Sequence, residues 1–335
     1  MNVGIVGAGL QGRRRAHALK QSKDTRLVAV ADINQDAANV LVGEMGGEVL
    51  PSWEEVTARK DIDIVVICTP PHLHVPISIA AMKNGKHILC EKPLALNLGG
   101  AEEMLAAAKE NDVTLKCGFN HRHHPAIKQA YDLLRRGAIG ELISVRGRYG
   151  IGGRLGFDKE WRAVLAIAGG GQLTDQGSHL VDLSRWFMGE ISEAIGFLAT
   201  SYWNIAPLED NASVLLRTSK GQVATLHTSW TQWKNLFSFE IFGRDGYILV
   251  DGLGGSYGTE RLIVGKRDFS RPFTEEVVEF RGEDRSWLDE WQEFIFAIRE
   301  HREPIGSGFD GLQVLKIVTA VYESVRRGSV TRVID

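Results

Sequence analysis

Apolar positions in the first third of the chain form short unbroken runs. These runs cover residues 2–6, 27–31, 63–68, 86–90 and 113–117. Segments of helical length lie between several of them, up to about residue 20 and over 75–83 and 98–109. Apolar strands that alternate with helices are typical of a parallel sheet covered on both faces. We therefore predict an α/β domain with a doubly wound parallel sheet over residues 1–121.

The pattern changes after about residue 122. Two predicted helices each end before a glycine, at residues 124–136 and 172–187. From 191 to 280, apolar and polar positions mostly alternate in short runs, such as 213–217, 223–228, 237–242 and 247–250. Such alternation indicates an antiparallel sheet with one buried face. With two late helices at about 287–300 and 311–326, residues 122–335 are predicted to form an α+β domain for substrate binding and oligomerisation, with a large, mainly antiparallel open sheet.

Length and charge narrow the class of protein. A chain of 335 residues exceeds what one core usually serves, which favours two domains. Lys and Arg number 39 against 42 Asp and Glu, so no basic field exists to hold nucleic acid. No apolar stretch reaches the roughly 20 residues of a membrane helix, and the first strand leaves no room for a signal peptide. An odd count of 3 cysteines fits a reducing compartment, so we expect a cytoplasmic protein.

A glycine-rich turn follows the first predicted strand. The motif is Gly7-Ala8-Gly9-Leu10-Gln11-Gly12, and a predicted helix starts inside it. The first glycine permits the turn, the second lets a pyrophosphate approach the backbone, and the third lets the helix pack on its strand. This context predicts a Rossmann dinucleotide site with contacts from Gly7, Gly9, Leu10, Gln11 and Gly12.

An acidic residue completes the dinucleotide pattern. Asp32 ends the second predicted strand, where a carboxylate accepts hydrogen bonds from the adenosine ribose hydroxyls. A 2′-phosphate would be repelled there, and Ile33-Asn34 supplies no cation. We therefore expect NAD rather than NADP. The alternative of a structural glycine turn beside an unrelated aspartate stays open.

Further motifs follow the later strands, at the sheet edge where ligands bind in such domains. They are Thr69-Pro70-Pro71-His72-Leu73-His74, Glu91-Lys92-Pro93 and Gly118-Phe119-Asn120-His121-Arg122, and a fourth, GGGQLTDQGSH, spans 169–179. Together with the glycine turn they resemble the glucose-fructose oxidoreductase / inositol dehydrogenase (GFO/IDH/MocA) family over nearly the whole chain. The resemblance implies a dehydrogenase of carbohydrate metabolism that moves a hydride between nicotinamide and a secondary alcohol of a sugar, nucleotide-sugar or cyclic polyol. It also implies cofactor contacts from Thr69, Pro70, His72, His74, Glu91, Lys92 and Asn120.

The resemblance also assigns the reacting groups. It implies that Lys92 lies beside the nicotinamide and the reacting hydroxyl, with a cis bond to Pro93, and that Asp175 and His179 form the acid/base pair. An ammonium can stabilise developing alkoxide character, and a histidine can take a hydroxyl proton near neutral pH. The residues alone leave open a solvated lysine and an ordinary helix-surface pair. On an α-helix, Asp175, His179, Asp182 and Trp186 would share one face.

A glycine-rich stretch precedes the segment of Asp175. Residues 148–156 lead to Phe157, Trp161 and Arg162, and the stretch is predicted to be a binding loop. Aromatic faces suit sugars and guanidinium groups suit carboxylate or phosphate oxygens, so we expect substrate contacts from Arg154, Trp161 and Arg162. Arg122 is a further substrate candidate. An ordinary flexible connection is the alternative.

Two other functions are compatible with the same motifs. The resembled family also contains NAD-dependent glycosidases, which oxidise a sugar transiently and retain the cofactor, and a nucleotide-bound regulator without catalysis is a third class. The histidines of the two histidine-rich motifs suggest a metal, but the resemblance requires none and we expect no metal. The open sheet would expose an apolar face in a monomer, so a homodimer or homotetramer is expected.

Overall fold

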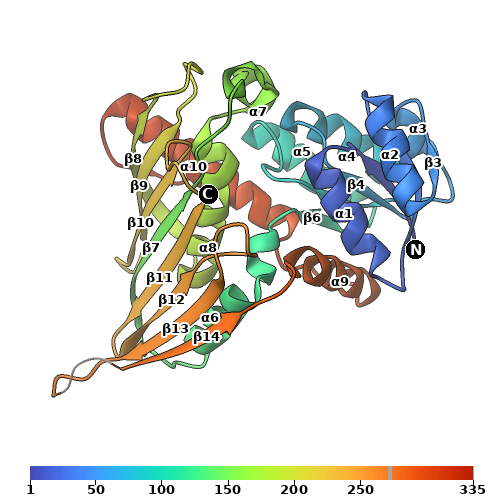
Figure 1. Cartoon of the computed structure of the whole chain (residues 1–335). Helices are drawn as coiled ribbons and strands as arrows, with labels where there is room; N and C mark the ends of the chain where they lie inside the picture. The colour runs from blue at the N-terminus through green and yellow to red at the C-terminus, as the bar shows by residue number, and fades with distance from the viewer. Residues whose placement is uncertain (271–273, 335) are drawn as a thin grey trace. The chain divides into compact units, whose positions relative to one another are not determined.

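The computed structural model describes residues 1–270 and 274–334 and divides into two compact units (Figure 1). Unit 1 comprises Met1–Asn120 with Trp287–Leu315, and unit 2 comprises His121–Ser286 with Lys316–Asp335. Residues 271–273, which fall in the segment predicted to form the open sheet, and Asp335 lie outside the described residues. A division into folding domains after residue 121 remains a prediction.

Unit 1 is built on a parallel sheet whose described strands follow the order β3-β2-β1-β4-β5-β6. The strands are β1 Asn2–Val6, β2 Arg26–Ala31, β3 Glu48–Val49, β4 Ile64–Ile67, β5 His87–Cys90 and β6 Leu115–Cys117. Five of these match the predicted apolar runs to within a residue or two, whereas β3 is too short to leave a pattern. The order reverses at β1, which pairs with both β2 and β4. The doubly wound fold is therefore confirmed, and its ligand edge lies beyond the carboxyl ends of these strands.

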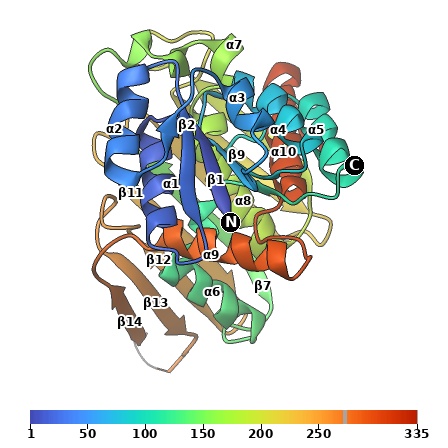
Figure 2. The ribbon, with the colours of Figure 1, turned by 90° about the vertical axis from the view of Figure 1, so that its right-hand side faces the viewer.

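Helices cover both faces of this sheet. Figure 2 shows α1 (Leu10–Lys20) and α2 (Gln35–Met45) on one side, with α3 (Trp53–Ala58), α4 (His74–Lys83) and α5 (Leu98–Glu110) on the other. Asn34, Ser52 and Asn97 cap α2, α3 and α5 by accepting backbone N–H bonds. The late helix α9 (Ser286–Arg299) joins the core of unit 1, because Trp291, Phe294 and Ile295 are buried in the same cluster as the apolar residues of β1.

Unit 2 holds a mixed sheet whose described strands follow the order β14-β13-β12-β11-β7-β10-β9-β8-β15. The strands are β7 Leu142–Gly150, β8 Ile191–Ala199, β9 Asn211–Thr218, β10 Val223–Ser229, β11 Leu236–Gly243, β12 Gly246–Asp251, β13 Glu260–Lys266, β14 Glu275–Phe280 and β15 Thr331–Arg332. Among the described pairs, β7 and β10 run parallel and the others antiparallel. The mainly antiparallel sheet is thus confirmed.

Helices cover one face of this second sheet. Figure 1 shows α6 (Pro125–Arg135) and α8 (Ser178–Met188) on the same side of it, and α7 (Leu165–Ala168) lies beyond the strand ends. Helix α10 (Gly308–Arg327) is the last helix of the described residues, and β15 follows it. Along β9, buried positions alternate with exposed ones, so the other face of the sheet is exposed there. That face carries exposed apolar side chains, including Phe197 at 80% and Leu215 at 46% exposure.

One predicted loop is partly a strand. Residues 148–150 of the expected glycine-rich loop belong to β7, the central strand that was missed. Its glycines serve packing, since a Cβ on Gly147 would lie only 3.1 Å from side-chain carbons of both Leu180 and Leu226. The first three residues of the predicted binding loop are therefore strand, whereas residues 151–156 contain no helix or strand.

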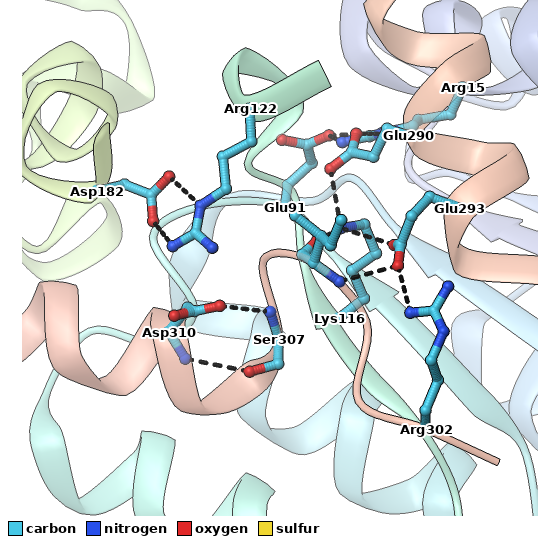
Figure 3. A network of polar contacts seen from close by, with 11 residues as sticks. Arg15, Glu91, Lys116, Arg122, Asp182, Glu290, Glu293, Arg302, Ser307 and Asp310 are labelled. Carbon is cyan, nitrogen blue, oxygen red and sulfur yellow. Dashed lines mark hydrogen bonds and ion pairs between the residues drawn. The ribbon is translucent and has the colours of Figure 1, made fainter. Parts of the chain in front are cut away.

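A buried ion network joins three elements of unit 1 (Figure 3). Arg15 of α1, only 2% exposed, donates from Nε to Glu91 Oε1 at 2.8 Å and from Nη1 to Glu290 of α9. Lys116 of β6 lies 3.6 Å from Glu290 and 3.9 Å from Glu293. Burial alone would lower the pKa of Arg15, but the charges of Glu290 and Glu91 raise it above its usual value. The guanidinium is therefore a permanent buried charge that depends on both carboxylates.

We expect Glu290→Gln to destabilise the protein by about 3–5 kcal/mol, because removing one partner leaves Arg15 and Lys116 under-compensated in the interior. Urea unfolding followed by circular dichroism would measure this change in the free energy of unfolding. The matched control is Glu300→Gln, since Glu300 is exposed and pairs with Arg302. A Glu290→Gln variant as stable as the control would contradict a structural role for the network.

Candidate functional site

The glycine turn of unit 1 has the geometry a dinucleotide needs. Gly7 adopts φ +101°, which side chains disfavour, and a Cβ on Gly12 would overlap the carbonyl oxygen of Gly7. A Cβ on Gly9 would meet nothing within 4 Å, so the backbone there is open to a ligand. Because α1 starts at Leu10 without an acidic side chain in its first turn, its N-terminus can receive a phosphate.

Asp32 fixes the end of β2 to this turn. Its Oδ2 accepts from the backbone N–H of Ala8 at 2.6 Å, and its Oδ1 accepts from that of Asn34 at 2.7 Å. The carboxylate therefore sits beside the glycine turn. An anion at this place and an open backbone at Gly9 both fit an NAD-type dinucleotide.

His74 ties together the turns after β4 and β5. The side chain is fully buried, with Nδ1 2.9 Å from the Pro93 carbonyl oxygen and Nε2 2.9 Å from that of Thr69. Burial lowers the pKa of His74, against the opposing effect of these carbonyls. The geometry favours a supporting role for His74, whereas half-buried Thr69 and Pro70 and exposed His72 keep surface for the predicted cofactor contacts.

Lys92 is the residue after Glu91, which belongs to the buried ion network. Glu91 is held by Arg15, and half-buried Lys92 comes next, with the expected cis bond to Pro93. Asn120, the last residue of unit 1 before the chain crosses over, is buried in a short 3₁₀ turn, Asn120–His123. The remaining predicted reacting groups, Asp175 and His179, belong to unit 2.

The segment that carries Asp175 and His179 is not one regular helix. The sequence predicted a single helix over residues 172–187, but the structure has a π-helix, Leu173–Gly177, followed by α8. A π-turn takes more residues than an α-turn, so the angular spacing of Asp175 from His179 differs from that expected on a regular α-helix, whereas His179, Asp182 and Trp186 all lie on α8. π-turns inside helices recur at functional sites.

A buried carboxylate holds the start of this segment. Glu209 accepts from the backbone N–H groups of Gly171 at 3.3 Å and Leu173 at 2.9 Å, and from the hydroxyl of Tyr322 at 2.8 Å. Burial raises the pKa of Glu209, although these hydrogen bonds oppose the change. The hydroxyl of Tyr322 also lies 2.9 Å from Thr174 Oγ1, inside the π-helix. These contacts give a physical reason for the local geometry that periodicity could not supply.

A series of ion pairs connects the predicted substrate loop with Asp175. Arg154 donates to Glu160 at 2.6 Å, Arg162 lies 3.6 Å from Glu160, and Arg162 Nε lies 3.8 Å from Asp175 Oδ2. The guanidinium of Arg162 also lies 4.3 Å from the ring centre of Trp161. The structure thus brings four of the predicted substrate residues, Arg154, Trp161, Arg162 and Asp175, into one connected series.

The predicted base lies against a second histidine. The rings of His179 and His121 are stacked, with centroids 3.8 Å apart and planes 18° from parallel. Arg122, the next residue along, makes a buried bidentate pair with Asp182 of α8 at 2.9 and 2.6 Å (Figure 3). Its charge is thus used inside unit 2, which favours a supporting role for Arg122.

Three residues that contact the segments of the candidate site were not predicted to do so from the sequence: Arg15, Glu209 and His121. Arg13, Arg14 and Arg15 follow one another on α1, yet Arg15 is buried while Arg13 and Arg14 are exposed. Helical spacing could have found it, because Arg15 shares the buried stripe of Gly12, Ala16 and Leu19. Glu209 acts through distant partners and left no local pattern, whereas His121 stood in the motif of residues 118–122 without a role of its own.

Over residues 1–270 and 274–334, no group of three or more His, Cys, Asp or Glu side chains is arranged to hold a metal ion. No helix in that same part of the chain is long and apolar enough to cross a membrane.

Comparisons with known proteins agree with the geometry. Residues 1–119 match the profile described as an oxidoreductase family with an NAD-binding Rossmann fold, and residues 127–249 match the GFO/IDH/MocA C-terminal domain. Inositol 2-dehydrogenase of Rhizobium meliloti is 30% identical, and the match covers 96% of both chains. Levoglucosan dehydrogenase of Pseudarthrobacter phenanthrenivorans is 28% identical, over 98% of this chain and 97% of that protein. A solved structure of levoglucosan dehydrogenase with NADH and levoglucosan has a TM-score of 0.90 at 28% identity, covering 100% and 99% of the two chains.

The bridge made by His74 predicts a pH-dependent stability. Because its pKa in the folded state lies below the usual 6.5, folding favours the neutral ring, and this contribution is present above pH 6.5 and lost as the pH falls. We expect His74→Gln to reduce the fall in unfolding free energy between about pH 7.5 and pH 5. Urea unfolding at both pH values measures the difference.

The control for this experiment is His17→Gln, because His17 is exposed on α1. It should keep the wild-type pH dependence. If His74→Gln also kept the wild-type dependence, the burial of a neutral His74 ring in the folded state would be contradicted.

Proposed function

Because the chain belongs to the GFO/IDH/MocA oxidoreductase family, we propose that it oxidises one secondary alcohol of a sugar, nucleotide-sugar or cyclic polyol with NAD. The observation that carries this proposal is the pairing of an NAD-binding Rossmann fold with a family C-terminal domain along one chain. Relatives named as inositol and levoglucosan dehydrogenases support the sugar or polyol class.

The chemistry divides between the cofactor and the protein. NAD, when bound, supplies the carbon that accepts the hydride from the carbinol. The open backbone at Gly9, the N-terminus of α1 and the carboxylate of Asp32 would hold the dinucleotide. Asp32 also disfavours a 2′-phosphate, which supports a preference for NAD over NADP.

Three side chains act on the substrate in this proposal. His179 accepts the proton of the reacting hydroxyl at a ring nitrogen, and Lys92 donates a hydrogen bond to the same oxygen as its negative charge develops. Asp175 orients the substrate or the base. The family resemblance of their motifs supports these roles, and so does the firm anchoring of both segments, through Arg15 for Glu91-Lys92 and through Glu209 for the π-helix.

Substrate recognition is assigned to the residues around Asp175. Trp161 offers a ring face to the apolar C–H side of a sugar, and Arg154 and Arg162 offer donors to its hydroxyl, carboxylate or phosphate oxygens. The connection of Arg162 to Asp175 supports this placement. The three cysteines form no disulfide among the described residues, which supports a cytoplasmic enzyme.

We expect Lys92→Ala and His179→Gln each to lower kcat by about 10²-fold or more, since each removes a group that stabilises the transition state. Steady-state NADH formation measures kcat, and circular dichroism checks folding. Lys83→Ala and His301→Gln are the controls, because both positions are exposed. Near-normal turnover in a folded Lys92 or His179 variant would contradict the assigned roles.

The substrate class is tested by a panel of polyols, sugars and nucleotide-sugars, assayed with NAD and with NADP. A dehydrogenase accumulates the reduced cofactor with at least one member, and we expect this with NAD. Product formation without net NADH would instead indicate a glycosidase that oxidises its substrate transiently. Loss of NAD preference in Asp32→Ala would support the assigned role of the carboxylate.

The same proposal includes a homodimer or homotetramer formed through the open sheet face. Phe197 of β8 and Leu215 of β9 lie on this face, because both are exposed at positions that alternate with the buried ones of their strands. Burial against a second copy of the chain would remove this apolar surface from water.

We expect light scattering to show a dimer or tetramer at micromolar concentration, and Phe197→Glu to shift the equilibrium toward monomer by placing a charge in the interface. Leu155→Glu is the control, because Leu155 is fully exposed in a loop at 100%. A strictly monomeric wild-type protein would overturn this part of the proposal.

A further inference from the structure

A second histidine accompanies the predicted base. His121 comes from the 3₁₀ turn Asn120–His123, and His179 comes from the first turn of α8. Both side chains are buried, with 5% exposure each, and their rings stack at a centroid distance of 3.8 Å. The mechanism proposed above uses His179 and gives His121 no role.

Resting on that proposed function, we propose that His121 is a positioning residue for His179, which fixes the plane of its ring and limits the two rings to one shared positive charge. The near-parallel stack, 18° between planes, restricts rotation of the His179 ring. A base whose ring plane is fixed presents its nitrogen to the substrate in one orientation.

The limit of one positive charge on the two rings follows from the short distance between their centroids. Two imidazolium rings 3.8 Å apart would repel strongly in a buried site, so the second proton binds much less readily than the first. The rings therefore titrate as a coupled pair. A base must be neutral before it accepts a proton, and this repulsion keeps His179 neutral whenever His121 is charged.

The stacked geometry also limits what His121 can do. Hydrogen bonds of imidazole lie in the ring plane, whereas these two rings meet face to face. Direct proton transfer between their nitrogens is therefore excluded in this arrangement. His121 acts on His179 through packing and charge, not as a relay.

Several titratable or charged groups surround the pair. His124 lies edge-on to His121 at 5.6 Å between centroids, and Tyr149 of β7 lies 5.2 Å from His121 and 6.2 Å from His179. Tyr257 in turn lies 5.0 Å from Tyr149. On the segments of the pair itself lie the remaining groups, Arg122, His123, Asp175 and Asp182.

The acidic groups beyond His124 are engaged elsewhere. Glu260 of β13 lies 3.0 Å from His124 Nδ1 and accepts from the backbone N–H groups of Ala126 and Gly254. Asp284 lies 3.9 Å from the same His124 nitrogen. Both carboxylates therefore lie at His124. The histidine that lies against the proposed base is His121.

The experiment follows the ring signals of the histidines by NMR during a pH titration of the whole protein without substrate. His121→Phe keeps a flat ring against His179 and removes the second titrating group, and His179→Phe does the converse. We expect replacement of the ring that binds the first proton to raise the titration midpoint of the other ring, because that ring then no longer takes up its proton beside a positive charge. The control is His227→Phe, which replaces a half-buried histidine on β10.

Activity supplies the second readout. In His121→Phe we expect the acid limb of the kcat profile to move to higher pH while the plateau is kept, and in His121→Ala we expect the plateau itself to fall because the stack is lost. Independent titration of the two rings, with unchanged midpoints in both Phe variants, would overturn the proposal. Since the NMR titration contains no substrate, it reports on the pair even if His179→Gln retains turnover and the base assignment fails.

Discussion

The buried charge of Arg15 is the constraint on which unit 1 depends. A guanidinium in the interior must be compensated in place, since its charge cannot be given up at any ordinary pH. The compensation comes from Glu91, at the end of β5, and from Glu290, on a helix almost 200 residues further along the chain. The glycine-turn helix, the end of the strand before Lys92 and α9 are thereby joined at one point.

Unit 2 also contains a buried ionisable group, the carboxyl group of Glu209, which must be compensated where it lies. The carboxylate of Glu209 is buried among donors from Gly171, Leu173 and Tyr322, and these donors lie where the π-helix begins. In both units, a buried ionisable side chain holds a segment that carries a predicted reacting group. Arg15 holds the segment of Lys92, and Glu209 holds the π-helix of Asp175. The side chains proposed to do chemistry therefore sit on backbone that has few alternatives, which is how an enzyme preorganises a site.

Much of the fold followed from the sequence because its elements have strong local patterns. The apolar strands β1, β2, β4, β5 and β6 and the glycine turn were predicted from neighbouring residues alone. The failures share a different cause. β7 contains glycines whose role is close packing against Leu180 and Leu226, and the π-helix is set by Glu209, more than 30 residues away. Such long-range contacts leave no periodicity to detect.

In the candidate site, too, features with a local sequence pattern were predicted and features set by long-range contacts were not. The motifs located Lys92, Asp175 and His179 as candidates, but the partners of these segments had to come from the structure. Arg15 could have been placed inside by its position on the buried stripe of α1, whereas the stack of His121 on His179 joins residues 58 positions apart and no pattern in the chain indicates it.

The bond from Ala8 to Asp32 has a consequence for how this enzyme could evolve. The carboxylate proposed to select the cofactor also secures the glycine turn, through the N–H of Ala8. A lineage that replaced Asp32 to accept a 2′-phosphate would loosen the pyrophosphate-binding loop in the same step. A change of cofactor preference therefore requires a second substitution that restores the loop, and the two positions are expected to change together.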